Sequence, residues 1–182
     1  MRDCALLLIL TASPAFAGFE DQVRNASLEV RETLAQKKAN APAQLRYPER
    51  CVLQAVAQSM GVQLRDDVPV PPVYYESKIP LRQFQDAVEP QWQMRPDVFV
   101  NAYIPAKNEV YLTDDSSYYT RLSRALDDSL AHEYAHYIQV KYKGTRLEDF
   151  GDAEEGQAIE HQTAFRENYI HKAPPEGFCP NR

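Results

Sequence analysis

The sequence has no hydrophobic run long enough to cross a membrane, no basic patch and no internal repeat. Its apolar run from Ala5 to Leu10 is far shorter than the roughly 20 residues that span a bilayer as a helix. The formal net charge of −6 gives no support for a nucleic-acid surface, which needs clustered Lys and Arg. We therefore expect no stable membrane insertion once a leader is removed, and no nucleic-acid partner.

The first 17 residues have the order of a secretory signal peptide. Arg2 precedes the apolar run, and residues 15–17 (Ala-Phe-Ala) form a small-residue cleavage signal. The remaining residues, 18–182, are enough for one hydrophobic core and too few for two comfortable domains. We therefore expect an exported protein, periplasmic or secreted, with a single domain.

Cysteine is scarce, with three in the chain. Cys4 lies in the predicted signal peptide, which leaves Cys51 and Cys179. In an oxidising compartment an even pair of cysteines predicts a disulfide. The bond would close a long loop, for which the chain-entropy model gives roughly 4 to 5 kcal/mol of stabilisation. The alternative, a nucleophilic Cys51, lacks any local sequence signature.

Two of the four histidines occur in an HExxH motif at residues 132–136. Apolar residues recur around it at helical spacing, which predicts a helix over residues 122–142. His132 and His136 then lie one turn apart on the same face, so both imidazoles can bind one ion, and the carboxylate of Glu133 can reach a metal-bound water. Zinc suits such a site because it accepts imidazoles, a carboxylate and a water in tetrahedral geometry. The alternative is an ordinary amphipathic helix whose histidines lie in solvent or make core hydrogen bonds.

A third metal ligand must come from elsewhere in the chain. The metzincin pattern would place Gly at 139 and His at 142, but the chain has Gln139 and Tyr142 there, which excludes that class. A second helix is predicted from about 153 to 171, after a polar loop. Eighteen residues separate His136 from Glu155, enough to end one helix, turn and present the first turn of another.

The HExxH motif, 18 residues and then Glu-Gly-x-Ala resemble the gluzincin zinc metallopeptidases. The resemblance implies that His132, His136 and Glu155 bind one zinc ion per chain, with Glu133 as the catalytic base. It also implies a zincin-like fold. The small size of the chain is similar to that of minimal single-domain gluzincins, or of an exported bacterial family of unassigned function.

The role of Glu155 has an alternative, because it could instead close a capping box with Asp152 at the start of the second helix. The chain also departs from the gluzincin pattern at Ile159. Many gluzincins have an acid at this place, four residues after the ligand Glu, that orients a zinc histidine. The other acids that could be the third ligand are Glu154, Asp152 and Glu160.

A β-hairpin is predicted before the HExxH helix, from strands over residues 97–104 and 109–113. Its Asn101-Ala102-Tyr103 segment is similar to the Asn-Ala-x-Tyr segment of neprilysin-like gluzincins. The resemblance implies that this strand is the edge of the substrate cleft, where Asn101 and Ala102 hold the substrate backbone. An open strand edge suits an extended peptide because its N–H and C=O groups are unpaired. The alternative is a plain core hairpin.

Further elements complete an α+β fold. Helices are expected over residues 20–39, 49–60 and 81–88, and a short strand over residues 73–75. Ser116 or Ser117 is expected to cap the HExxH helix. The predicted architecture is a zincin-like single domain in which a small twisted sheet packs on the HExxH helix and on the ligand-bearing helix after it.

These features together predict zinc-dependent hydrolysis of a peptide or protein substrate, with Glu133 as general base. Two alternatives are a non-catalytic binding module with a zincin fold and a hydrolase of a non-peptide amide in the cell envelope. The sequence does not choose the donor that would stabilise the oxyanion. The candidates for that donor are His161, His171, Tyr169 and Tyr103.

Overall fold

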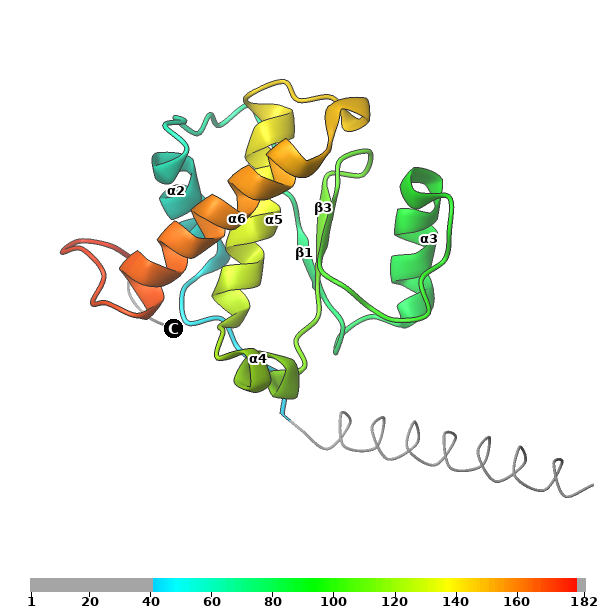
Figure 1. Cartoon of the computed structure of the whole chain (residues 1–182), viewed down its shortest axis with the longest axis horizontal. Helices are drawn as coiled ribbons and strands as arrows, with labels where there is room; N and C mark the ends of the chain where they lie inside the picture. Colours follow the sequence, from blue (N-terminus) through cyan, green and yellow to red (C-terminus); the bar gives the residue numbers. More distant parts are fainter. Residues whose placement is uncertain (1–40, 180–182) are drawn as a thin grey trace, which may run out of the picture. The chain divides into compact units, whose positions relative to one another are not determined.

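The computed structural model describes residues 41–179. The predicted signal peptide, residues 1–17, and the predicted helix over residues 20–39 lie outside this part of the chain. The described residues form an α+β domain with five α-helices, α2 to α6, and one three-stranded sheet (Figure 1). The predicted α+β class is therefore confirmed. Within residues 41–179, no helix combines the length and the apolar character needed to span a bilayer.

The sheet is mixed, with the strand order β1-β3-β2. β1 (Val73–Tyr75) runs parallel to β3 (Glu109–Leu112), and β2 (Ala102–Ile104) runs antiparallel to it. β2 is therefore an edge strand of the described sheet. The prediction of a strand over residues 97–104 is wrong for its first five residues, because β3 has only four residues to pair with and Val98 is mostly exposed.

Three helices cover one face of the sheet, as Figure 1 shows. They are α2 (Glu49–Ser59), α5 (Leu126–Lys141) and α6 (Asp152–Phe165). Val110 and Leu112 of β3 belong to the same hydrophobic core as these helices. Nearly every residue of α5 is buried, because α5 lies between the sheet and the other two helices. The HExxH motif is thus held by the most enclosed helix of the domain.

The other face of the sheet is covered by α3 (Leu81–Trp92) and has a smaller, aromatic core. The rings of Phe84 and Phe99 stack with centroids 4.4 Å apart, and Tyr111 of β3 lies against Phe84 at 5.5 Å. α3 continues four residues beyond the predicted end at residue 88. It accommodates Pro90 in its last turn and ends at Gln93, whose φ of 56° is left-handed.

The helix predicted over residues 122–142 is confirmed over Leu126–Lys141, which form α5, whereas its first residue ends a separate helix, α4 (Ser116–Leu122). α4 ends at Ser123, which has a φ of 51°, and α5 begins at Leu126. The predicted cap for the HExxH helix at Ser116 or Ser117 is wrong. Asp115 caps α4 by accepting a 3.0 Å hydrogen bond from the Ser117 N–H. The first turn of α5 is closed instead by Asp128, whose carboxylate accepts from the Ala125 N–H at 3.2 Å.

The disulfide predicted between Cys51 and Cys179 is present, with the two Cα atoms 5.9 Å apart. It ties the C-terminal segment to α2, and Phe178 packs edge-on against Tyr47 with ring centroids 5.1 Å apart. The bond suggests an oxidising, extracellular environment for the protein. The predicted helix over residues 153–171 is also largely confirmed, because α6 continues into a π-helical turn at Arg166–Ile170.

A buried carboxylate fixes the start of α5. Asp127 is fully buried and accepts hydrogen bonds from the backbone N–H groups of Arg46, at 2.9 Å, and Tyr47, at 3.0 Å. Burial raises the pKa of Asp127, and these hydrogen bonds act in the opposite direction. The contacts hold the chain before α2 against the first turn of α5, one and a half turns before the HExxH motif.

Candidate metal centre

His132, His136 and Glu155 bring three metal-binding atoms together between α5 and α6. The Nε2 atoms of the two histidines lie 3.1 Å apart. One carboxylate oxygen of Glu155 lies 3.2 Å from Nε2 of His136, and the other lies 3.4 Å from Nε2 of His132. The histidines come from successive turns of α5, and Glu155 comes from the first turn of α6. The group could therefore bind a metal ion.

The spacing of the three donors fits a small tetrahedral ion. With metal–ligand distances of about 2.0–2.1 Å, a tetrahedron has edges of roughly 3.3–3.4 Å. The observed separations of 3.1 to 3.4 Å are close to these edges, with the two histidines facing different oxygens of Glu155. Taken with one donor atom from each residue, the group lies within 4.8 Å. Two imidazoles and one carboxylate are also donors that suit first-row transition metals better than Ca²⁺ or Mg²⁺. Three protein ligands leave a fourth position open.

The start of α6 decides between the two roles considered for Glu155, metal ligand and helix cap. α6 begins after Gly151, and it is Glu154 that closes the first turn, by accepting a 3.1 Å hydrogen bond from the Gly151 N–H. The alternative, a capping box between Asp152 and Glu155, is therefore absent. Glu155 is free of that role, and its carboxylate faces the histidines. The other acids considered as the third ligand, Glu154, Asp152 and Glu160, are not part of the converging group.

Two glutamines contact the histidines in place of the missing acid. Gln139, on α5, has its Oε1 atom 2.9 Å from Nδ1 of His136. Gln162, on α6, makes a hydrogen bond with His132 that acts to raise the pKa of this histidine. Ile159, where many gluzincins have the orienting acid, is about half exposed. Gln139 could have been found in the sequence, because it lies one helical turn after His136.

Burial sets the charge state of His132. It lowers the pKa of His132, and the neighbouring His136 lowers it further, whereas the charge of Glu155 and the Gln162 contact raise it. The pKa of His132 is lowered overall, so its neutral imidazole is favoured near neutral pH. The neutral form is the one that binds metals.

Glu133 lies beside the converging donors and faces β2. Its side chain is almost completely buried, and burial raises the pKa of Glu133 to about 8. A hydrogen bond from the backbone N–H of Tyr103 lowers this pKa, and the charge of Glu155 raises it. The carboxylate is thus held at the boundary between the candidate metal centre and the edge strand.

The edge strand β2 turns backbone groups toward this site. Tyr103 is opposite Val110 in the antiparallel ladder, but the Val110 N–H donates to Pro72 on the other side of β3, at 2.9 Å. Paired residues alternate between bonded and unbonded in such a ladder, so the backbone groups of Tyr103 point away from β3. This orientation agrees with the hydrogen bond from the Tyr103 N–H to Glu133.

A cleft of about 240 Å³ opens over these groups. Asn101 and Ala102 both line it, beside Glu133. The Oδ1 atom of Asn101 accepts a 2.9 Å hydrogen bond from the Thr113 N–H, which holds this side chain against β3. The predicted role of Asn101 and Ala102 in holding a substrate backbone stays a prediction.

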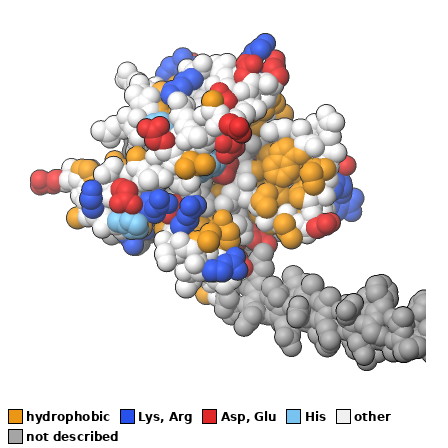
Figure 2. Space-filling view, viewed as in Figure 1, with side chains coloured by type: hydrophobic (Ala, Val, Ile, Leu, Met, Phe, Trp, Pro, Cys, Tyr) orange, Lys and Arg blue, Asp and Glu red, His pale blue; other side chains and the backbone are white. Residues whose placement is uncertain are grey.

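The opposite wall of the cleft was not expected from the sequence. Gln91 and Trp92, at the end of α3, line it together with Phe150 from the loop before α6. The Phe150 ring also packs on His136, with centroids 5.4 Å apart. Figure 2 shows hydrophobic side chains gathered on the side of the molecule where α3 lies, next to acidic side chains near its middle. The exposed hydrophobic residues after α3 include Met94 and Val98.

The four candidates for an oxyanion donor make other contacts. Nδ1 of His171 lies 3.2 Å from a carboxylate oxygen of Glu167, and Tyr169 lines the pocket that contains His161. Tyr103 lines the cleft, but its hydroxyl donates to Asn108 at 2.9 Å. His161 lies in a second pocket, described next. Neither His161 nor His171 belongs to the converging group of metal-binding residues.

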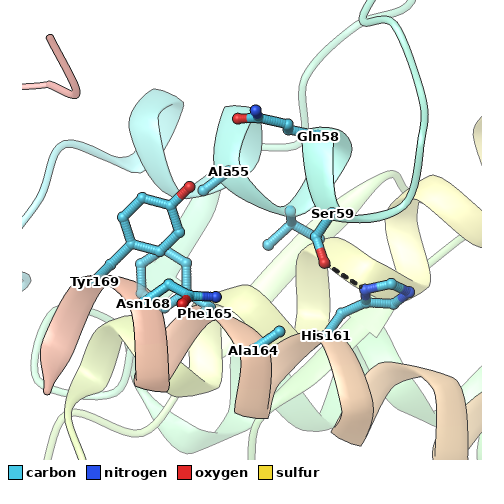
Figure 3. A pocket seen from close by; sticks show the side chains of 9 residues that line it. Ala55, Gln58, Ser59, His161, Ala164, Phe165, Asn168 and Tyr169 are labelled. Atoms are coloured by element: carbon cyan, nitrogen blue, oxygen red, sulfur yellow. Dashed lines mark hydrogen bonds between the residues drawn. The ribbon is translucent and has the colours of Figure 1, made fainter. Parts of the chain in front are cut away.

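The second pocket lies between α2 and the later turns of α6, with a volume of about 180 Å³ (Figure 3). Ser59 and His161 meet in it, with Oγ 2.8 Å from Nδ1. A catalytic serine–histidine pair also needs an acid that orients the histidine and donors for an oxyanion. The residues that line this pocket include no Asp or Glu. We therefore assign it no chemistry and call it the Ser59–His161 pocket.

Comparison of the chain with protein-family models, with curated proteins and with solved structures finds no match.

Proposed function

We propose that this protein is a zinc-dependent hydrolase of peptide bonds with a zincin-like fold of the gluzincin type. The observation that carries the proposal is the convergence of His132, His136 and Glu155, whose donor atoms lie within 4.8 Å of one another. Two imidazoles and a carboxylate with one open position are the ligand set of catalytic zinc sites in peptidases. Structural zinc sites are closed by a fourth protein ligand instead.

A zinc ion in this site would act as a Lewis acid and lower the pKa of a bound water toward about 7. Glu133 is next to His132 in the chain and reaches into the same cleft. The positive charge of the metal would favour the ionised form of Glu133 against its raised pKa, so that its carboxylate can accept the proton of the attacking water and then pass that proton to the leaving amine. The protein thus has a general base directly beside its candidate metal centre.

An extended peptide fits the edge of the sheet above Glu133. The backbone carbonyl of Tyr103 points away from β3 and can accept a hydrogen bond from a substrate strand, as exposed sheet edges do in peptide recognition, whereas its N–H is bonded to Glu133. Asn101 and Ala102 would lie along the same substrate segment. The wall formed by Trp92 and Phe150 favours an apolar side chain near the bond that is cut.

The test is a peptide-library digest by wild-type protein and by Glu133→Gln, with bound zinc measured in parallel. Gln keeps the size of Glu but cannot act as a base, so we expect zinc to stay and hydrolysis to fall by about 10²- to 10⁴-fold. Equal cleavage by both proteins would contradict the role of Glu133. No cleavage by zinc-loaded wild type would favour the binding module or a non-peptide amide substrate.

A matched pair of variants tests the third ligand. Glu155→Gln should weaken zinc binding, because it replaces a charged ligand by a neutral amide. The control is Glu154→Gln, which alters the neighbouring acid and affects only the helix cap on Gly151. Equal zinc affinity in both variants would contradict Glu155 as a ligand.

A further inference from the structure

We infer that Gln139 is a positioning residue for the metal site: it fixes the tautomer of His136 and joins α5 to the turn of α6 that carries Glu155. This inference rests on the proposed metal site. Gln139 is 1% exposed, although a glutamine is a polar residue that is seldom buried without partners. It has three partners within hydrogen-bonding distance, and they lie on both helices.

The partners of Gln139 determine the orientation of its amide. Its Nε2 atom donates to the backbone carbonyl of Glu154 at 2.9 Å and to Oε1 of Gln157 at 3.1 Å. A carbonyl oxygen can only accept, so the NH₂ group of Gln139 must face α6. The Oε1 atom of Gln139 then faces Nδ1 of His136 at 2.9 Å.

The same orientation fixes the proton on His136. Because Oε1 of Gln139 is an acceptor, Nδ1 of His136 must carry the hydrogen. The neutral ring has only one N–H, so its Nε2 atom keeps a lone pair. That atom is the one that faces His132 and Glu155, at 3.1 and 3.2 Å. Gln139 therefore selects the tautomer that can bind a metal through Nε2.

The bonds to α6 have a second consequence. Glu154 and Gln157 flank Glu155, so the amide of Gln139 holds the turn that presents the third ligand. Gln139 thus orients the Nε2 lone pair of His136 and also holds the carboxylate of Glu155 at its distance from the histidines. Partners of this kind typically change metal affinity by about 10- to 100-fold when they are removed.

The experiment compares Gln139→Leu with wild type by two measurements. The first is the tautomer of His136 in the metal-free protein at pH 8, read from long-range ¹H–¹⁵N correlations of the imidazole. The second is zinc affinity, read from competition with a chelator. We expect the Leu variant to lose the preference for the Nδ1–H tautomer and to bind zinc about 10- to 100-fold more weakly.

Gln157→Leu is the matched control, because it removes one partner of the amide and leaves the contact to His136. It should keep the tautomer and lose less zinc affinity than Gln139→Leu. Gln139→Glu is a second variant, which tests the inference if Gln139→Leu does not fold. Its carboxylate still accepts from Nδ1 but cannot donate to Glu154, so the tautomer should persist while zinc affinity falls.

Three outcomes would overturn the inference. They are a folded Leu variant with the wild-type tautomer and zinc affinity, a Glu variant that loses the Nδ1–H tautomer, and a Gln157→Leu control that loses as much affinity as Gln139→Leu. Wild-type protein that binds no zinc would contradict the proposed metal site instead. The tautomer in metal-free protein then still tests Gln139 on its own.

Discussion

The cleft at the candidate metal centre and the Ser59–His161 pocket both contain a buried or half-buried histidine with a polar partner. His136 has Gln139 at 2.9 Å, and His161 has Ser59 at 2.8 Å. Burial lowers the pKa of His132 in the cleft and of His161 in the pocket. A polar contact and a shifted pKa are therefore common to both places and do not distinguish them.

The two places differ in what faces the second ring nitrogen. In the cleft, Nε2 of His136 faces another imidazole and a carboxylate at metal-ligand spacing. In the Ser59–His161 pocket, the lining residues include no acid and no second histidine. The comparison teaches that converging donors, and not the presence of a hydrogen-bonded histidine, identify the site that can do chemistry.

The largest expected effect contrasts the two histidines directly. His136→Ala should abolish tight zinc binding, a loss beyond the roughly 100-fold that removal of an outer partner can cause. His161→Ala should leave zinc affinity unchanged, because His161 is not among the converging donors. Isothermal titration of both variants measures the difference. Comparable zinc affinity in the two variants would remove the distinction between cleft and pocket.

Removal of the disulfide tests whether the stability of the Ser59–His161 pocket region affects zinc binding in the cleft. Cys51 lies on α2, close in sequence to the α2 residues that line the Ser59–His161 pocket. Cys51→Ala with Cys179→Ala should lower the free energy of unfolding by about 2–5 kcal/mol, because the unfolded chain regains a long open loop. Denaturant unfolding measures this loss. Zinc affinity of the folded double variant should stay at the wild-type value, and a parallel loss of affinity would show that the cleft depends on the disulfide.

The smallest expected effect concerns Gly156, which follows Glu155 in the motif that resembles gluzincins. A Cβ atom placed on Gly156 would meet no atom within 4 Å, and the residue lies inside α6. Gly156→Ala should therefore stabilise the protein by about 0.4–1 kcal/mol, because Ala loses less conformational freedom on folding. Thermal unfolding with and without zinc measures the change. A destabilised variant would mean that the turn carrying Glu155 needs a glycine.

Local geometry explains which parts of the site the sequence could predict. The pairing of His132 and His136 follows from helical spacing alone, so the motif predicted it. The role of Glu155 was open, because a shift of one residue at the start of α6 decides whether Glu154 or Glu155 caps the helix. Helix ends are the least certain part of any prediction from sequence. The structure starts the helix after Gly151 and so leaves Glu155 free.

Long-range contacts explain what the sequence could not predict. Gln91 and Trp92 reach the cleft because α3 packs across the sheet from α5, and no local pattern records that packing. The strand over residues 97–104 was overextended because its length depends on the short partner β3. The α+β class and the disulfide were predicted correctly, since each depends on composition and compartment more than on exact packing.

The central claim is that His132, His136 and Glu155 form one metal centre. X-ray absorption spectroscopy of the zinc-loaded protein tests it most directly. The account predicts one zinc ion per chain with two imidazole nitrogens at about 2.0–2.1 Å and oxygen ligands at about 2.0–2.2 Å. The spectrum of His136→Ala should show at most one imidazole on any zinc that remains. A wild-type spectrum without two imidazoles, or no bound zinc at all, would contradict the claim.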